Sequence, residues 1–549
     1  MPQSRAKFLI PAVGTAVVAG GVATYFYLNG AFGNSSSPLA SAKLVPDTAV
    51  MATSVSADNW SKLQQFGTPE AQNVIGKSLQ DLNQKFVAQS NIDYEKDLKP
   101  WVGNVMIATL PSNSINSPQT TQLGQGQNLL TIVGIKDKLS ALNFANKVKA
   151  EKGVTIQESD YNGEKISQVT QSGATSYSAV LNDHLVLASN ITAVQQAIDT
   201  FKGKPSFASK SGVDDMIAKG VEVQNPLAQI YIPDSTSAVQ QLTATNPTAS
   251  QLPPQTLASL KSVKSLAAGI GVEDVGIRVR VVAHLDPQLI KTQYQPTAGT
   301  VASQLPGDTI ALVSGQGISR GWAQVVEQTK TNPALKQAID SVRQRFQFVN
   351  IDLDRDIFSW MDGEFASAII PLNQGPLASI GFSGGFIFHT SNRQTAEDTL
   401  SKLDKLAQFY SLSVNQTNIQ GKAVTQWQAP SQGVLVGHGW LDQNSVFIAV
   451  GDQVINAIAS PKNPALDNSE TFKAVTGSLP KPNGGYFYID MDKAVSLVTN
   501  NILRPQNINV PADASAVLNS IRGIGATASS PDSSTSEADL LIALKQRKG

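Results

Sequence analysis

Two short acidic runs are the first residues of this sequence whose spacing suggests chemistry. Each run places a carboxylate at every second position, and their members are Asp93, Glu95 and Asp97 in the first half and Asp352, Asp354 and Asp356 in the second. Three oxygen ligands with this spacing resemble the start of a calcium-binding loop. Leu98 and Ile357 stand where an EF-hand needs glycine, and no glutamate follows at its twelfth position. The runs are therefore candidate cation sites that lack half of the motif.

A capping role is the alternative interpretation of these runs. Asp97 and Asp356 each precede a tryptophan, Trp101 and Trp360, by four residues. A carboxylate before a short helical segment accepts N–H bonds that otherwise have no partner. The missing part of the calcium motif favours capping over cation binding.

Ser383 is the one candidate nucleophile that a motif suggests, because residues 381–385 read G-F-S-G-G and match G-x-S-x-G. That motif needs a strand before the serine and a helix after it, but the following Phe386-Ile387-Phe388 predicts a strand. The corresponding first-half stretch, LGQGQN, has no serine. A hydrolase at Ser383 is thus an alternative and not the main expectation.

The four histidines do not form a recognisable catalytic or metal-binding motif. They are isolated in the sequence, without an H-E-x-x-H pattern: His184, His284, His389 and His438. The glycine-rich pieces lack the Gly-Lys-Ser/Thr ending of a P-loop and the helix that follows a dinucleotide fingerprint. We therefore expect no cofactor and no enzymatic activity.

Composition narrows the possible partners. Lys and Arg total 42 against 42 Asp and Glu, and charged residues make up 15% of the chain, below the ~25% of soluble domains. A neutral, weakly charged chain does not capture nucleic acid by long-range electrostatics. The absence of cysteine excludes disulfides, thiolate nucleophiles and Cys-ligated metal centres.

The amino terminus predicts a membrane anchor. Residues 8–28, FLIPAVGTAVVAGGVATYFYL, carry no charge and would span about 32 Å as a helix. Arg5 and Lys7 precede them, which predicts a cytoplasmic segment at residues 1–7 and everything after the anchor on the other side of the membrane. Residues 29–43 read as a flexible tether.

Two further interpretations of this region remain open. Ala40-Ser41-Ala42 would serve as a cleavage site if the segment were a secretory signal, although the apolar run is longer than a signal core. Small residues also recur along one face of the predicted helix and could support self-association: Ala12, Ala16, Gly20 and Thr24.

The remainder of the chain resembles one module written twice, at an offset of about 258 residues. NIDYEKDLKPWVGNVMIATLP from Asn91 matches NIDLDRDIFSWMDGEFASAIIP from Asn350, and other matches follow in the same order. We expect a first domain at residues 44–287, a linker at 288–304 and a second domain at 305–546. Loops differ most between the copies, so recognition is expected there.

Each copy predicts a mixture of strands and helices. Apolar alternation indicates strands at 49–55, 105–110, 129–135, 178–181, 185–188, 228–232 and 276–283. Helical spacing appears in three sets: Leu79, Leu82, Phe86 and Val87; Leu139, Leu142, Phe144, Ala145 and Val148; and Val194, Ala197, Ile198 and Phe201, with Thr192 as a possible cap. Asn162-Gly163 and Asn182-Asp183 supply hairpin turns. The expected class is α+β with mainly antiparallel sheets, in two homologous domains behind one transmembrane helix.

The internal repeat also gives predictions for the six tryptophans. Trp60 with Trp322 and Trp101 with Trp360 occupy matched places and predict core anchors. Trp427 and Trp440 occur in one copy alone, so they are the better candidates for exposed contacts, although core packing is the main expectation for each. The uncharged stretch from Phe365 to Arg393 is broken by Pro371 and Pro376, so it predicts two strands and not a second membrane helix.

The opening VPDTAV, the D-L-x-x-W-x-G segment before a strand and the single amino-terminal anchor resemble a family of cyanobacterial membrane-anchored proteins known only as a domain of unknown function. The resemblance implies a periplasmic or thylakoid-lumen ectodomain and supplies no catalytic residues. We therefore predict a non-catalytic, membrane-tethered extracytoplasmic binding or assembly module with a protein partner. A metal-dependent enzyme, or a protein that binds a lipid or solute, would also be compatible with the sequence.

Overall fold

The computed structural model describes residues 37–547, except 75, 78–83, 85–91, 112–127, 152, 172–173, 220, 246–261, 289–293, 377 and 461–463. The predicted anchor at 8–28 and the predicted helix around Leu79 to Val87 lie outside the described residues. In the part of the chain that is described, no helix has the length and apolar character needed to cross a membrane.

The chain divides into two compact units. Of the described residues, those within 1–65, 72–291 and 533–536 belong to the first unit, and those within 66–71, 292–532 and 537–549 belong to the second. Each unit has apolar core residues of its own.

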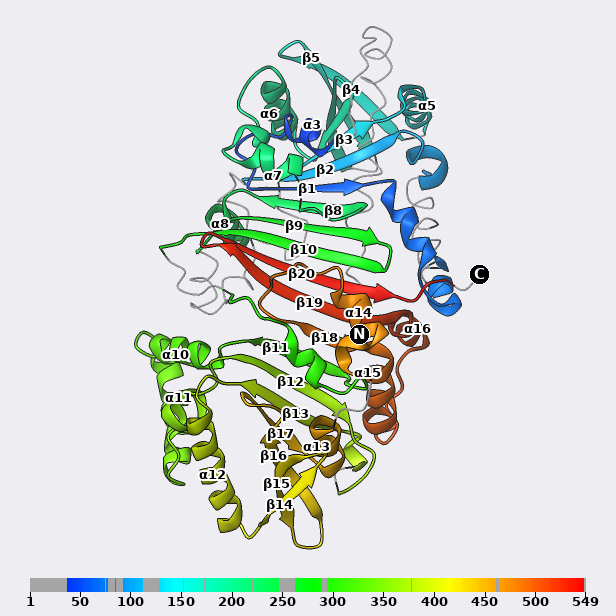
Figure 1. Cartoon of the computed structure of the whole chain (residues 1–549). Coiled ribbons are helices and arrows are strands. Elements are labelled where there is room, and N and C mark those ends of the chain that lie inside the picture. The colour runs from blue at the N-terminus through cyan, green and yellow to red at the C-terminus, as the bar shows by residue number, and fades with distance from the viewer. Residues whose placement is uncertain are drawn as a thin grey trace. The chain divides into compact units, whose positions relative to one another are not determined.

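The first unit contains an antiparallel sheet whose strands pair in the order β10–β9–β8–β1–β2–β3–β7–β6–β5–β4 (Figure 1). The strands are β1 (Met51–Ser56), β2 (Val102–Leu110), β3 (Asn128–Ile135), β4 (Val154–Tyr161), β5 (Glu164–Gln171), β6 (Ala174–Leu181), β7 (His184–Ala188), β8 (Pro226–Ile232), β9 (Val263–Glu273) and β10 (Gly276–Leu285). Its helical elements are α3 (Pro38–Ala42), η1 (Asn59–Gln65), the π-helical turn η2 (Tyr94–Leu98), α5 (Lys138–Lys149), α6 (Ile191–Phe201), η3 (Phe207–Ser209), α7 (Val213–Lys219) and α8 (Ser235–Thr245).

The second unit has a sheet with the pairing order β20–β19–β18–β11–β12–β13–β17–β16–β15–β14. Its strands are β11 (Ala311–Gln316), β12 (Glu364–Pro371), β13 (Phe382–His389), β14 (Ser413–Ile419), β15 (Lys422–Ala429), β16 (Gly433–Trp440), β17 (Ser445–Val450), β18 (Phe487–Asp490), β19 (Ile521–Asp532) and β20 (Thr535–Leu544). Its helical elements are η5 (Thr300–Gln304), α10 (Ile318–Gln328), α11 (Pro333–Gln347), the π-helical turn η6 (Leu353–Phe358), η7 (Ala378–Ile380), α12 (Arg393–Phe409), α13 (Asp452–Ala459), η8 (Leu466–Asn468), α14 (Glu470–Thr476), α15 (Met491–Val498), η9 (Thr499–Leu503) and α16 (Ala512–Ser520).

The two sheets have the same connectivity and the same register around a central strand. In the first unit Ala52 of β1 pairs with Ala108 of β2 and with Tyr231 of β8. In the second, Leu312 of β11 pairs with Ala368 of β12 and with Tyr488 of β18. Both tyrosines are completely buried. This common register gives a residue-by-residue correspondence between the units, independent of sequence similarity.

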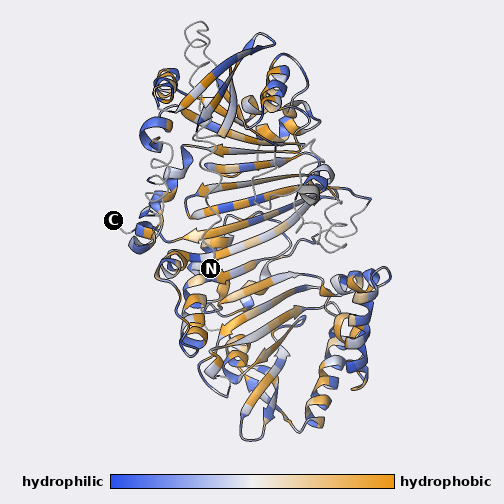
Figure 2. Cartoon of the chain, turned by 180° about the vertical axis from the view of Figure 1, so that it is seen from behind, coloured by the Kyte–Doolittle hydropathy of each residue, from blue (hydrophilic) through white to orange (hydrophobic). Residues whose placement is uncertain are grey.

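Helices cover both faces of each sheet. Successive strand side chains point to opposite faces, so each sheet has apolar residues to bury on both. In the first unit, α6 and α7 pack with β2, β3 and β7 in the main apolar core, whereas α5 packs with Trp101 on the opposite face. In the second unit α12 packs with Trp360, Phe388 and Val446 on one face, and α13 contacts β13, β16 and β17. Apolar residues also colour parts of the α10–α11 hairpin (Figure 2).

The predicted α+β class and the antiparallel pairing are confirmed. The uncharged stretch after Phe365 forms β12 and β13, as predicted. No strand range was predicted for β4, β5 or β9, although Asn162-Gly163 predicted the hairpin turn that joins β4 and β5. β4, for example, alternates only in its first four residues and is largely exposed beyond them. The cap of α6 is Asn190, whose side chain accepts from the backbone N–H of Ala193, and not Thr192. A side chain must precede the first helical residue to act this way.

The tryptophan predictions were right for one matched pair. Trp101 and Trp360 are core residues, at 2% and 1% exposure. Trp60 is 52% exposed and Trp322 is only half-buried, so the prediction of this pair as core anchors was wrong. Trp427 and Trp440 are half-buried, and Arg393 lies over the Trp440 ring at 4.0 Å.

Candidate functional site

The acidic runs form the first turn of the π-helical segments η2 and η6. Asp352 is the N-cap, since its carboxylate accepts from the backbone N–H of Arg355 at 3.0 Å. Asp356 accepts in return from the backbone N–H of Asp352, also at 3.0 Å. This is a reciprocal capping box, with one more residue between its members than in an α-helix.

The same box occurs in the first unit. Asp93 accepts from the backbone N–H of Lys96 at 3.1 Å, and Asp97 accepts from that of Asp93 at 2.7 Å. Capping therefore takes place, but the N-caps are the first aspartates of the runs. Our assignment of the cap to Asp97 and Asp356 was wrong in this respect, because those residues close the box from inside the turn.

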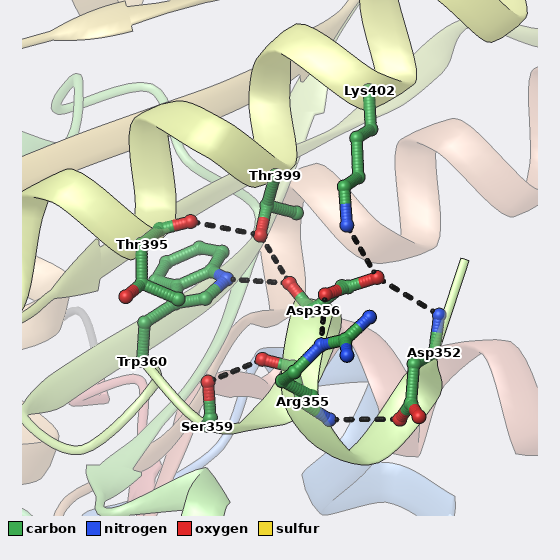
Figure 3. A network of polar contacts seen from close by, with 8 residues as sticks. All are labelled: Asp352, Arg355, Asp356, Ser359, Trp360, Thr395, Thr399 and Lys402. Atoms are coloured by element: carbon green, nitrogen blue, oxygen red, sulfur yellow. Dashed lines mark hydrogen bonds and ion pairs between the residues drawn. The ribbon is translucent and has the colours of Figure 1, made fainter. Parts of the chain in front are cut away.

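A lysine from the next helix completes each turn. Lys402 of α12 donates to Asp356 at 2.8 Å, and Lys147 of α5 donates to Asp97 in the same way. The indole N–H of the tryptophan four residues later donates a hydrogen bond to the backbone carbonyl of the same aspartate, at 3.1 Å for Trp360. Figure 3 shows how these groups converge from η6 and α12. We call this arrangement the Asp–Lys–Trp clasp.

The electrostatics of the clasp keep Asp356 ionised. A hydrogen bond from Arg355 and another from Lys402 lower the pKa of Asp356 far below that of a free carboxyl, although burial acts in the opposite direction. Thr399 also donates to the Asp356 carbonyl oxygen and so joins α12 to the turn. The carboxylate oxygens are thus occupied by protein donors.

The six acidic residues do not converge on a common point. Glu95 pairs with Lys99 at 2.6 Å, and Asp354 pairs with Arg343. Across the described residues, no three or more His, Asp or Glu side chains form a group that could hold a metal ion. The geometry therefore assigns the acidic runs to caps and ion pairs.

A pocket of about 440 Å³ lies beside the clasp of the second unit. We call it the Trp322 pocket, and its principal walls are Trp322, Ala323, Val326, Arg343, Asp354 and Phe358. The Trp322 ring stacks on Phe358 with centroids 4.2 Å apart. Its indole N–H donates to Asp354 at 2.5 Å, and Arg343 donates to the same carboxylate at 2.9 Å. The Arg343 bond lowers the pKa of Asp354.

The helices that form this pocket lie at the surface, and the larger apolar side chains of α10, from Ile318 to Val326, are half-buried. Neither α10 nor α11 contains a buried residue. Val342 is 40% exposed and Phe348, just beyond α11, is 89% exposed. Sequence reasoning found Trp322 and Asp354 separately but missed their contact with each other, with Arg343 and with Phe358. The apolar spacing of residues 318, 322, 325 and 326 was the available signal for α10.

Ser383 does not lie in a nucleophile elbow. It stands within β13, paired with Ile370 of β12, and is buried. His389 ends the same strand, where its Nε2 lies 3.1 Å from Gln304. No turn leads from this serine into a helix, so the geometry that G-x-S-x-G requires is absent.

The two buried histidines, His184 and His438, have structural surroundings. His438 bonds to Asp404 at 2.8 Å, and Trp427 donates to the same carboxylate at 2.7 Å. Burial raises the pKa of Asp404, but these two hydrogen bonds outweigh it and hold the pKa below the usual range. Burial lowers the pKa of His184 to about 4, so its ring is neutral near pH 7.

Comparisons with known proteins give a family and little else. No curated protein matches this chain significantly. Among solved structures, crystal form IV of TP0453 has a TM-score of 0.27 and 8% identity, covering 45% of this chain and 81% of that one. Crystal form I of TP0453 has a TM-score of 0.25 and 7% identity, covering 45% and 78%. Similarities this low carry no argument about this chain.

The sequence resemblance to a family of unknown function is confirmed by a family model that matches residues 9–544. The chain therefore belongs to the family described as Protein of unknown function (DUF3352).

Proposed function

We propose that this protein is a non-catalytic, membrane-tethered binding or assembly module, and that the Trp322 pocket receives a protein partner. The observation that carries the proposal is the exposure of α10 and α11, which are amphipathic and yet contribute no buried residue. Exposed apolar surface of this kind, rimmed by polar groups, is typical of protein-interaction sites.

The chemistry of the pocket defines the kind of partner. The stacked Trp322 and Phe358 rings offer a flat apolar floor, and Val326 adds to it. The α10–α11 hairpin, residues 318–347, carries five basic residues against two acidic ones. An apolar side chain on an acidic segment would match both features, because aromatic anchors and charge complementarity dominate such interfaces.

The clasp supports this role by fixing the pocket wall. Asp354 lies within η6, whose first turn is held by the Asp352–Asp356 capping box and by Lys402. A rigid wall lowers the entropy lost on binding.

Site-specific photocrosslinking in native membranes tests the proposal. A photoreactive residue at Val326, in the pocket wall, should crosslink one reproducible protein, and Trp322→Ala should abolish that product. A photoreactive residue at Gln337, exposed on the same hairpin, is the matched control and should not give it. The identified protein should then bind the purified chain, with at least a tenfold loss for Trp322→Ala. Equal crosslinking from both positions, or none from Val326, would rule out the pocket as the docking site.

The anchor and the duplication belong to the same proposal. Residues 8–28 would hold the chain in the membrane, with the two units in the periplasm or the thylakoid lumen. The shared register around Ala52 and Leu312 supports descent of both units from one module. Extraction of membranes with alkaline carbonate tests the anchor, since a spanning chain stays in the pellet. Protease protection in intact vesicles tests its orientation.

A further inference from the structure

The first unit contains a polar pocket of about 220 Å³, unrelated to the Trp322 pocket. It lies at the end of β1, β2 and β8, beside the start of η1. We call it the Asn104 pocket, and its polar walls are Ser54, Asp58, Asn59, Asn104, Lys136 and Gln229. The volume is below the ~300 Å³ at which sites for drug-sized ligands begin, so it suits a smaller molecule.

Asn104 contributes a buried donor without a partner. Its side chain is 8% exposed, and its Oδ1 accepts from the Ser54 hydroxyl at 2.8 Å. The Nδ2 of Asn104 is buried and makes no hydrogen bond among the described residues. Buried polar groups are nearly always paired, so an unpaired amide on a pocket wall calls for a ligand group.

Gln229 presents a second amide in the same pocket wall, on the strand residue that pairs with Ser54. Its oxygen accepts from the Tyr231 hydroxyl, which is deeply buried. Burial raises the pKa of Tyr231, so the phenol stays protonated and remains the donor. With the oxygen occupied, the amide nitrogen of Gln229 is the group left for a ligand.

The other polar residues of the pocket contribute hydrogen-bond acceptors, and their charges sum to zero. Lys136 and Asp58 form an ion pair at 2.8 Å, so their charges cancel. The amide nitrogen of Asn59 donates to the Pro226 carbonyl at 2.8 Å, which leaves its oxygen as an acceptor. The pocket therefore combines donors from Asn104 and Gln229 with acceptors from Asp58 and Asn59.

In the second unit the equivalent position has a partner within its own chain. Glu364 stands four residues before Ala368, as Asn104 does before Ala108. The Oε2 of Glu364 accepts from both the backbone N–H and the hydroxyl of Thr300, at 3.1 and 2.7 Å, whereas its Oε1 is buried and makes no hydrogen bond among the described residues. Thr300 stands six residues before the bridging Pro306, and Ala40 stands six before the bridging Pro46. Alanine has no hydroxyl, so the first unit lacks this internal partner.

We propose that the Asn104 pocket binds a small uncharged polyhydroxylated solute, of the size of a monosaccharide or a sugar alcohol. Hydroxyl groups donate and accept, so one such molecule satisfies the Asn104 and Gln229 amides together with Asp58 and Asn59. The cancelled Lys136–Asp58 charges disfavour an ion. This site is independent of the protein-docking role of the second unit.

Saturation-transfer NMR on the full-length protein tests the proposal, with glucose and sorbitol as probes and acetate as the anionic comparison. Glucose or sorbitol should receive saturation at millimolar concentration. Asn104→Leu, which keeps the branched shape and the number of side-chain heavy atoms, and Asp58→Asn, at a mostly exposed side chain, should each weaken binding at least tenfold. Glu364→Gln, the matched change in the second unit, should leave it unchanged.

Circular dichroism of each variant separates loss of binding from loss of fold, and Asp58→Asn keeps the test decisive if Asn104→Leu does not fold. Transfer to acetate without transfer to either polyol would overturn the ligand class. A weak site of this kind is expected to have a Kd of about 1 mM. If neither probe receives saturation at a concentration about 20-fold above that Kd, or if the transfer persists in both variants, the proposed site is wrong. Neither result bears on crosslinking from Val326.

Discussion

Lys402 of α12 reaches across to the turn η6 and donates to the carboxylate of Asp356 at 2.8 Å. Asp356 is 6% exposed and also accepts from its own turn, so the lysine is one of several donors that hold a buried anion. The first unit repeats this pair with Lys147 and Asp97. The clasp joins the turn to the helix beside it.

Removal of the buried carboxylate should loosen the second unit. We expect Asp356→Asn to lower the free energy of unfolding by about 2 kcal/mol, because Lys402 and the Asp352 N–H lose a charged acceptor. Urea unfolding of the full chain measures this loss. Asp354→Asn, in the same turn but 44% exposed, is the control and should cost less than about 1 kcal/mol.

A double-mutant cycle then isolates the pair. Asp356→Asn combined with Lys402→Met should cost less than the sum of the single changes. The lowered pKa of Asp356 means that its contribution is complete above the ordinary carboxyl pKa and is lost as the pH falls below it. If the two substitutions have additive effects, the clasp does not couple the helix to the turn. The same conclusion follows if Asp356→Asn leaves the loss of unfolding free energy at acid pH unchanged.

The two tryptophans beside η6 should respond differently to the same substitution. Trp360 is buried and donates to the Asp356 carbonyl, so Trp360→Phe should cost about 2 kcal/mol through the lost hydrogen bond and the smaller ring. Trp322 is half-buried in a pocket wall, so Trp322→Phe should cost less than about 1 kcal/mol. Thermal unfolding compares them, and equal costs would contradict a surface role for Trp322.

His184 should make the protein acid-sensitive well above the range of its carboxylates. Burial lowers the pKa of His184 from 6.5 to about 4, so the unfolded chain binds this proton more readily than the folded one. The contribution of the neutral His184 ring to the free energy of unfolding should be fully present above pH 6.5. It should be lost between pH 6.5 and 4, which lowers the free energy of unfolding by up to about 3 kcal/mol. His184→Gln should flatten that interval in a pH series of urea unfolding. His284→Gln, at a residue that is largely accessible, should leave the slope unchanged.

Two glycines with positive φ should differ in their tolerance of alanine. At Gly485, with φ of 117°, an added Cβ would lie 2.2 Å from the Ser314 carbonyl oxygen. At Gly421, with φ of 83° in the β14–β15 turn, nothing lies within 4 Å. We expect Gly485→Ala to cost more than about 2 kcal/mol and Gly421→Ala about 1 kcal/mol, measured by thermal unfolding. A smaller loss at position 485 would mean that β18 can move away from β11.

The sequence by itself determined the parts of this protein that depend on local pattern. The alternation around Val105 to Leu110 and the helical spacing from Leu139 to Val148 predicted elements correctly, because one face of each is buried. Asn162-Gly163 predicted the β4–β5 hairpin, since both residues accept positive φ. The paired acidic runs also identified the turns η2 and η6, and Trp101 and Trp360 were correctly placed in the core.

Only the tertiary structure decided what those residues do. The carboxylate of Asp356 resembled a cation ligand until Lys402, from a helix beginning at Arg393, was seen to occupy it. The Trp322 pocket needs the contact of α10 with η6, and the Asn104 pocket needs β1, β2 and β8 side by side. Such contacts join residues far apart in the chain, and their distances depend on how the elements pack, which periodicity along the sequence does not encode.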